Sequence, residues 1–160
     1  MLKIKKFVFN PFSENTLVLS DEQSNCVVID PGCYHSHEVK ELEEYIVSNN
    51  LKVVSILQTH SHLDHMFGTS YLANKYKVPV FIHKYDELTF NSFEMVCKMY
   101  GIPINYNQAV EINYFDTQKG FYLGRHYLEI KFVPGHAPGH VVFYNAENKF
   151  VINGDCLFQS

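Results

Sequence analysis

Short apolar runs rich in β-branched residues alternate along the chain with segments that carry the period of an amphipathic helix. Three apolar runs open the sequence at residues 3–12, 14–20 and 24–30, and the polar stretch "SDEQSN" separates the last two. Because Asn, Ser and Asp favour turns between strands, this pattern predicts an antiparallel meander.

The first helix is expected over residues 36–50. Val39, Leu42 and Ile46 fall on one stripe of that helix, and Ser36 can cap its start. A strand follows at residues 52–59, with apolar residues on both faces, as in a sheet covered on both sides.

The rest of the chain predicts two more helical stretches and then strands. A helix is expected over residues 64–77, a short strand over 78–83, and one or two helices over 85–101, closed by Gly101. Further strands are expected over 110–115, 120–133, 139–145 and 149–154. Strands, outer helices and strands again indicate a layered α/β sandwich.

Length and composition narrow the class of protein. The 160 residues suggest one domain spanning residues 1–160, and 46% hydrophobic with 19% charged residues is an ordinary globular composition. A net charge of -4 without a Lys/Arg cluster argues against a nucleic-acid partner. The N-terminal residues resemble neither a secretory signal nor a membrane span, because Lys5, Lys6 and Asn10 interrupt the apolar run. We therefore expect a cytoplasmic protein that does not bind membranes and keeps its four cysteines reduced.

The stretch "THSHLDH" gathers metal-binding side chains directly after the strand at residues 52–59. Residues two apart in an extended segment point the same way, so His60 and His62 can converge. Asp64 and His65 lie where the chain turns toward the next helix and can face a second point nearby. Imidazole nitrogens and carboxylate oxygens together suit Zn²⁺, and also Fe²⁺ or Mn²⁺.

Two later segments have the same character. "FVPGHAPGH" places His136 on a turn after a strand, and "FVINGDCLF" places Asp155 after a strand and a glycine. Alone, His136 would be a turn histidine and Asp155 a turn or cap residue. Beside "THSHLDH", both are expected to contribute to the metal site.

The ordered set "THSHLDH", "PGHAPGH" and "NGD" resembles the metallo-β-lactamase superfamily. More narrowly, it resembles the short glyoxalase II-like (hydroxyacylglutathione hydrolase-like) hydrolases. The resemblance implies a four-layer αββα sandwich. It also implies that His60, His62 and His136 hold a first metal, that Asp64 and His65 contribute to a second, and that Asp155 bridges the two.

The sequence also departs from that family. Members of the family continue beyond the "GD" segment and supply one more histidine ligand, whereas this chain ends at Ser160. We therefore expect an incomplete second half of the sandwich, a weak second metal site, and association of the chain into a homodimer.

The expected reaction follows from the metal. A divalent metal lowers the pKa of bound water from 15.7 to about 7, which gives hydroxide at neutral pH. The resemblance implies a small thioester substrate such as an acylglutathione, with one or two Zn²⁺ ions as cofactor. Asp64 and Asp155 are the expected catalytic carboxylates, with Asp64 either binding metal or orienting the water. Asp30 is either a carboxylate that fixes a ligand imidazole or a turn residue.

Two other functions stay open on the sequence. An iron-dependent persulfide dioxygenase needs only a 2-His-1-carboxylate set, which His60, His136 and Asp155 provide. A non-catalytic, metal-stabilised fragment would bind metal without turnover.

Three of the remaining histidines carry weaker expectations. His83 is expected to pack at the end of a strand, His126 to lie on the outer face of its strand, and His140 to shape the pocket.

Overall fold

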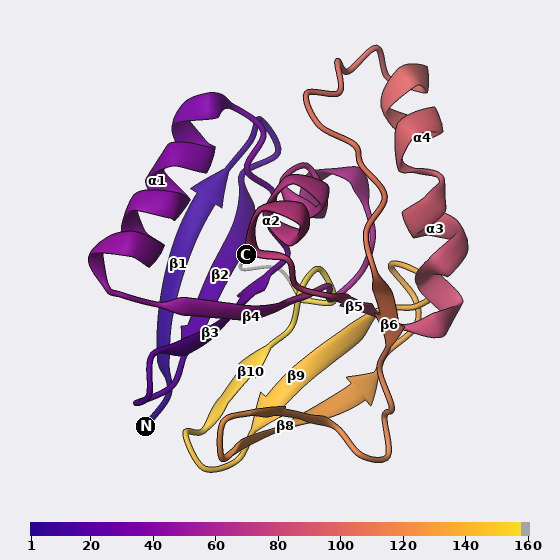
Figure 1. Ribbon diagram of the computed structural model, residues 1–160. Coiled ribbons are helices and arrows are strands. Elements are labelled where there is room, and N and C mark those ends of the chain that lie inside the picture. Colours follow the sequence, from indigo (N-terminus) through magenta and orange to yellow (C-terminus); the bar gives the residue numbers. More distant parts are fainter. Residues whose placement is uncertain (158–160) are drawn as a thin grey trace.

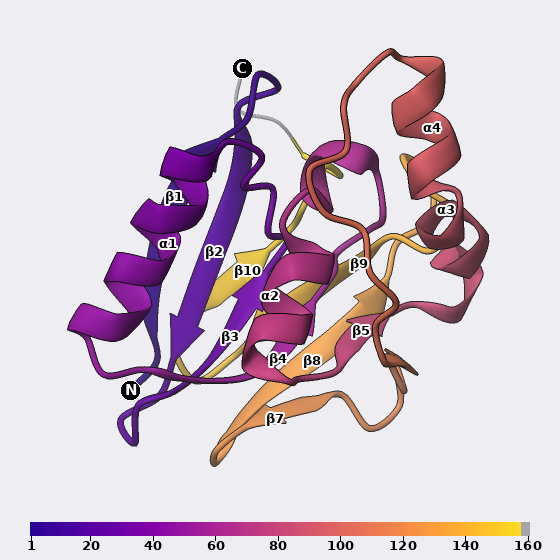
Figure 2. The same cartoon turned by 45° about the horizontal axis from the view of Figure 1, so that its top comes forward.

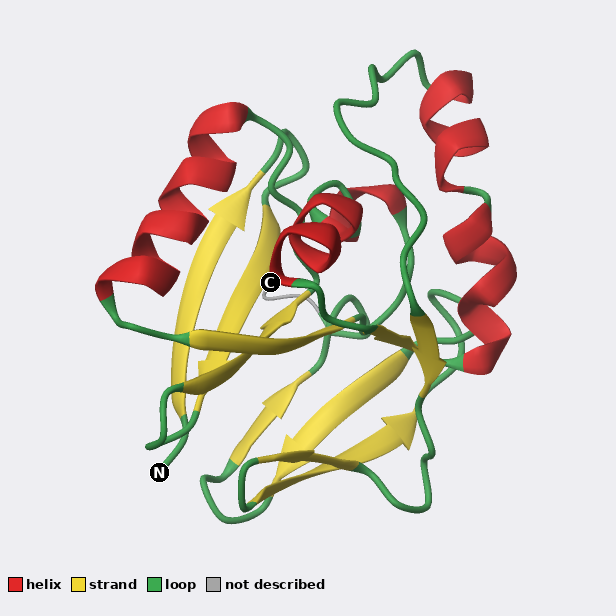
Figure 3. Ribbon diagram, viewed as in Figure 1, coloured by secondary structure: helices red, strands yellow, loops and turns green. Residues whose placement is uncertain are grey.

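Two β-sheets pack face to face, and helices cover the outer face of the larger sheet (Figures 1 and 3). The computed structural model describes residues 1–157. The larger sheet has the strand order β1 (Lys3–Phe9), β2 (Glu14–Ser20), β3 (Asn25–Ile29), β4 (Lys52–Leu57), β5 (Val80–Ile82) and β6 (Ile112–Tyr114). The smaller sheet has the order β10 (Phe150–Ile152), β9 (Val141–Asn145), β8 (His126–Phe132) and β7 (Phe121–Leu123).

The larger sheet changes from antiparallel to parallel at β3. The first three strands form the predicted meander, with Leu17 opposite Ile29. From β3 to β6 each pair is parallel, so every connection has to cross over the sheet. The crossovers contain α1 (Ser36–Ser48), then η1 (Leu63–His65) and α2 (Thr69–Tyr76), and finally η2 (Lys84–Asp86), α3 (Glu87–Asn91) and α4 (Phe93–Met99).

Alternating side chains of the central strands build two cores. Val28 packs with Leu42 and Leu72 of the helices, whereas Val27 and Ile29 pack against the smaller sheet. Both faces of β3 are therefore buried, which explains why its sequence is continuously apolar.

The start of α1 differs from the prediction. His35, not Ser36, occupies the N-cap position. The buried carboxylate of Glu38 accepts backbone hydrogen bonds from His35 (2.9 Å), Tyr34 (2.8 Å) and Asn10 (2.7 Å). A carboxylate three residues into a helix can reach back to the unpaired N–H groups at its start, which makes a Ser36 cap unnecessary.

The helix predicted over residues 64–77 is split. η1 and α2 are separated at Gly68, whose N–H donates to the Pro31 carbonyl at 2.8 Å. A Cβ at this glycine would lie 2.2 Å from Cys33 Sγ. The close contact with the loop after β3 therefore bends the chain where the periodicity alone predicts a continuous helix.

The smaller sheet presents an open face to solvent. Tyr122, Tyr144 and Val151 on that face are exposed. Residues 1–157 thus form helix, sheet and sheet layers, three of the four expected. Within the same residues, every helix is too short or too polar to cross a lipid bilayer.

The prediction that His126 lies on the outer face of its strand is wrong. Its side chain is fully buried, and it shares the inner face of β8 with Leu128 and Ile130. The alternation of the strand already carried this information, because residues two apart share a face.

Candidate metal centre

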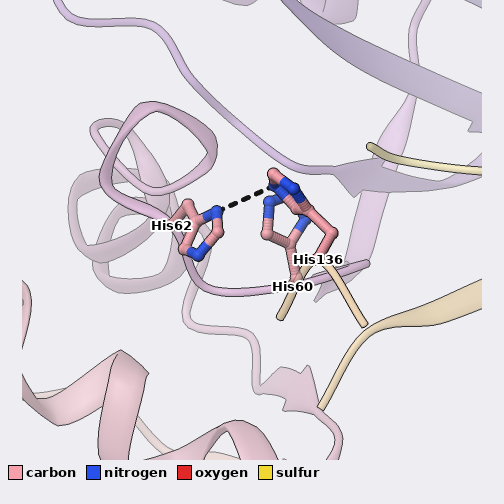
Figure 4. A group of neighbouring side chains, drawn as sticks. All are labelled: His60, His62 and His136. Carbon is pink, nitrogen blue, oxygen red and sulfur yellow. Dashed lines mark hydrogen bonds between the residues drawn. The ribbon is translucent and has the colours of Figure 1, made fainter. Parts of the chain in front are cut away.

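Three histidines from two loops converge at one end of the sheets (Figure 4). His60 and His62 follow β4, and His136 lies in the loop between β8 and β9. Their candidate ligand atoms all lie within 4.8 Å of one another, and His62 Nδ1 is 3.0 Å from His136 Nε2. The sequence prediction that these three side chains come together is therefore matched by their geometry.

Hydrogen bonds to Thr59 hold the two loops in position. The Thr59 carbonyl accepts a hydrogen bond from the N–H of Val141 at 2.8 Å, which joins the start of β9 to the end of β4. The carboxylate of Asp30 accepts from the Thr59 N–H at 2.6 Å. The histidines are thus fixed by the ends of three strands from both sheets.

The chemistry of His60 fits a metal ligand. Its side chain is buried, and its Nε2 atom has no hydrogen-bond partner among the described residues. Burial, followed by the charges of His65 and His62, holds the pKa of His60 far below its usual range. The pKa of His62 is also lowered, first by burial and then by His136. Neutral imidazoles with an accessible lone pair are what a divalent metal requires.

His65 lies beside this group in a different environment. Its Nδ1 atom is 3.1 Å from Asp30 Oδ2, and its Nε2 atom is 3.2 Å from Asp155 Oδ1 and 3.6 Å from Asp64 Oδ2. Burial opposes the charged form, but hydrogen bonds to Asp155 and Asp30 together with nearby carboxylate charge raise the pKa of His65 well above its usual value. Asp30, His60 and His65 form a second group with ligand atoms within 4.8 Å.

Asp155 lies between the two groups. Its Oδ2 atom is 3.4 Å from His136 Nε2, while Oδ1 faces His65. The turn that carries it needs a glycine at the preceding position. Gly154 has φ +50°, and a Cβ there would lie 2.4 Å from Thr59 Oγ1. The backbone N–H of Asp155 donates to His140 Nε2 at 3.1 Å, which ties the turn to the "PGHAPGH" loop.

All six residues named from the sequence meet at this site. They are His60, His62, Asp64, His65, His136 and Asp155. Asp64 belongs to neither compact group and approaches them through His65. Which of the six bind metal, and how many ions they hold, stay predictions.

Asp30 has the environment of a carboxylate that orients a ligand. It leaves β3 with φ +48°, and its side chain contacts both Thr59 and His65. Of the two roles open on the sequence, the geometry favours fixing an imidazole over a simple turn.

Glu14 was missed by the sequence analysis. Its carboxyl group is buried at the start of β2, with Oε1 3.8 Å from His65 Nδ1. Burial, partly offset by the charge of His65, raises the pKa of Glu14 to about 9. A single glutamate at the start of a strand carries no local signal, because its partner is 51 residues away in sequence.

His140 and His83 have structural contacts. The ring of His140 stacks on His60 with centroids 4.8 Å apart, in line with the expectation that it shapes the pocket. His83 stacks on Phe132 at 4.2 Å, as expected for a packed residue.

The chain is similar to known proteins in both sequence and fold. The family model described as the metallo-β-lactamase superfamily matches residues 9–160. The chain is 30% identical to the probable metallo-hydrolase YqgX of Bacillus subtilis, over 99% of this chain and 72% of that protein. It is 32% identical to the hydroxyacylglutathione hydrolase GloC of Haemophilus influenzae, over 92% of this chain and 68% of that protein. Among solved structures, TTHA1623 in a di-iron-bound form superposes with a TM-score of 0.82 at 26% identity, covering 97% of this chain and 73% of that one.

Proposed function

The chain belongs to the metallo-β-lactamase superfamily of metal-dependent hydrolases, and we propose that its substrate is a small thioester. The observation that carries the proposal is the three-histidine group, in which the buried His60 is neutral and its Nε2 atom lacks a hydrogen-bond partner among the described residues. Such a group has the donor chemistry that a divalent metal needs.

We assign the first metal position to His60, His62 and His136. The second position would draw on Asp64 and His65, with the Asp155 carboxylate shared, because its two oxygens face His136 and His65. A metal held there supplies hydroxide at neutral pH and polarises a carbonyl group. Zn²⁺ suits these donors, and so do Fe²⁺ and Mn²⁺.

The carboxylates orient the reacting water. Burial disfavours the charged form of Asp155, but its hydrogen bond to His65 and the charges of His65 and His136 lower its pKa, so the group is ionised. Asp155 therefore accepts hydrogen bonds and does not donate them. Asp64, 3.6 Å from the same imidazole, adds a second acceptor on that side.

The thioester specificity has a narrower basis. A relative with 32% identity is named hydroxyacylglutathione hydrolase. In an acylglutathione the acyl group is bonded to the sulfur atom of glutathione, so the compound is a thioester. A thioester carbonyl needs only hydroxide and polarisation to react, so no side-chain nucleophile is required.

A thioester panel tests the proposal. Zinc-loaded protein assayed under nitrogen should hydrolyse small acyl thioesters, and chelation of the metal should abolish the activity. Consumption of oxygen by iron-loaded protein with a persulfide, without thioester hydrolysis, would replace the proposal with the dioxygenase. Metal binding with neither activity would identify a metal-stabilised, non-catalytic protein.

A further inference from the structure

A pocket of about 330 Å³ lies directly beside the candidate metal centre. Two of its lining residues, His62 and Asp64, belong to that centre, and α4, which packs against η1, contributes Phe93 and Val96 to the lining. Figure 2 shows α3 and α4 on the side of the molecule opposite α1. The other lining residues are Phe12, Ser61, Leu63, Thr89, Phe93, Val96 and Tyr100.

The walls of this pocket are held in place by the fold. Phe93 is only 6% exposed and packs in a core cluster against Phe67, with ring centroids 6.1 Å apart. On the other side, the Asn10 amide donates to the Asp64 carbonyl at 2.9 Å, and its oxygen accepts from the N–H of Phe12 at 3.0 Å. The turn that carries Phe12 is therefore tied to the metal loop, which fixes the backbone on this side of the pocket.

The charge of the lining restricts what it can bind. Among the described residues, neither lysine nor arginine lines the pocket, and its one carboxylate is that of Asp64. An anionic group placed against the α4 wall, away from the candidate metal centre, would lose its hydration without a cationic side chain to pair with it. A neutral apolar group, in contrast, would bury its surface against Phe93, Leu63 and Val96.

Asp64 also lines a second pocket, of about 400 Å³. The lining of this second pocket is mixed: it includes the polar or charged residues Lys6, Asn15, Asn153, Glu14, Asp30 and Asp155 and the apolar residues Ile4, Leu17, Val151 and Ile152. The second pocket therefore offers a lysine and several carboxylates, which the first pocket does not.

We infer that the pocket between η1 and α4 binds the acyl group of the substrate and selects neutral, apolar acyl chains, aryl or branched alkyl, over anionic ones. The inference rests on the proposed thioester hydrolysis. Both substituents of a thioester are bonded to the reacting carbonyl carbon, so the size and the charge of the pocket decide which of them it binds. Carrier thiols such as glutathione are larger and charged, which this small pocket, without lysine or arginine among its described lining residues, does not match. Phe93, Val96 and Tyr100 are the specificity-determining residues.

Three thioesters of one neutral thiol, N-acetylcysteamine, test the inference. Zinc-loaded protein should hydrolyse the phenylacetyl thioester with a kcat/KM at least tenfold above that of the acetyl thioester, since each buried methylene is worth about fourfold. The succinyl thioester should be no better than acetyl. Val96→Trp should fill the pocket and remove the phenylacetyl preference, while the zinc content of the protein stays the same. The matched control Val47→Trp, at an exposed position of α1, should keep the preference.

A binding measurement tests the pocket independently of thioester hydrolysis. The non-hydrolysable 2-phenylethyl thioether of N-acetylcysteamine should bind by isothermal titration calorimetry, and Val96→Trp should weaken it at least tenfold. If no thioester is hydrolysed but this binding and its loss are observed, the pocket stands and the proposed function fails. A flat or succinyl-preferring acyl profile, or a Val96→Trp variant that retains phenylacetyl selectivity, overturns the inference even if hydrolysis is confirmed. Absence of both hydrolysis and thioether binding overturns the function and the pocket together.

Discussion

His60 and His126 are both fully buried, yet they lie at opposite ends of the sheets in opposite surroundings. His60 is ringed by other histidines, with centroids 4.1 Å from His65 and 4.6 Å from His62. His126 is held between two carboxylates, with Nε2 2.7 Å from Glu22 and Nδ1 2.8 Å from Glu147. The first environment lowers the pKa, and the second raises it.

The two environments indicate different roles: His60 is suited to bind a metal, and His126 to stabilise the fold. The neutral imidazole of His60 keeps a lone pair available for a metal, whereas an imidazolium between two glutamates uses both ring nitrogens as donors. His126 connects the β2–β3 turn, the start of β8 and the β9–β10 turn, and it has no neighbour in the candidate metal centre. Substitutions at the metal centre should therefore change activity, and substitutions around His126 should change stability.

The largest effect is expected at Asp155. Asp155→Asn should lower kcat/KM for a thioester more than 100-fold, because the amide removes the charge shared by His136 and His65. The neighbouring exposed thiol provides the control. Cys156→Ser should stay within about threefold of wild type. The reverse order in steady-state kinetics would indicate covalent catalysis by Cys156.

The second effect concerns stability at the other end of the molecule. His126→Gln should lower the free energy of unfolding by about 2 kcal/mol, since it replaces two hydrogen bonds to charged partners with at most neutral ones. The loss is modest because both partner carboxylates are partly exposed, with 38% of the Glu22 side chain and 60% of the Glu147 side chain accessible to solvent. Denaturant unfolding measures the change, and zinc content should stay the same. Loss of zinc in this variant would show that the two ends are coupled.

The stability that His126 contributes should depend on pH in a defined direction. Hydrogen bonds to Glu22 and then Glu147 raise the pKa of His126 above its unfolded value near 6.5. The stabilisation is therefore fully present below about pH 6.5 and is lost as pH rises through the folded-state pKa. The stability gap between wild type and His126→Gln should shrink from pH 6 to pH 9. A gap that widens over this range would mean that His126 is neutral in the folded protein.

The smallest effect on stability is expected at Glu147, the more exposed of the two carboxylates that pair with His126. Glu147 has 60% of its side chain exposed, so Glu147→Gln should lower the melting temperature by less than about 2 °C. Glu22 also pairs with Arg125 at 2.7 Å, and its pKa is lowered to about 2, first by the hydrogen bond to His126. Glu22→Gln should therefore lower the melting temperature more than Glu147→Gln, as calorimetry of the two variants can compare.

The local parts of this account could be predicted from the sequence. Period and turn residues gave the opening meander and α1, and the tight spacing of His60, His62 and His65 identified the metal loop. The family resemblance then placed His136 and Asp155 beside that loop, and the geometry agrees.

Two features could not be predicted because they depend on contacts distant in sequence. The break at Gly68 comes from its packing against Cys33. The cap of α1, in contrast, is local, because Glu38 accepts from His35 three residues earlier, and only its bond from Asn10 is distant in sequence. Glu14 reaches the site only through strand pairing. The expected homodimer, the cytoplasmic location and the thioester specificity stay predictions, because the fold of one chain does not determine them.

The central claim is that His60, His62 and His136 bind a divalent metal, and a zinc titration of matched variants tests it most directly. Wild-type protein should bind about one equivalent tightly. His62→Ala should weaken that equivalent at least 100-fold, because a ligand is removed and not merely a residue that orients one. His37→Ala, at an exposed histidine of α1, should bind zinc like wild type. Equal zinc affinity of His62→Ala and wild type would contradict the assignment of this group as the metal site.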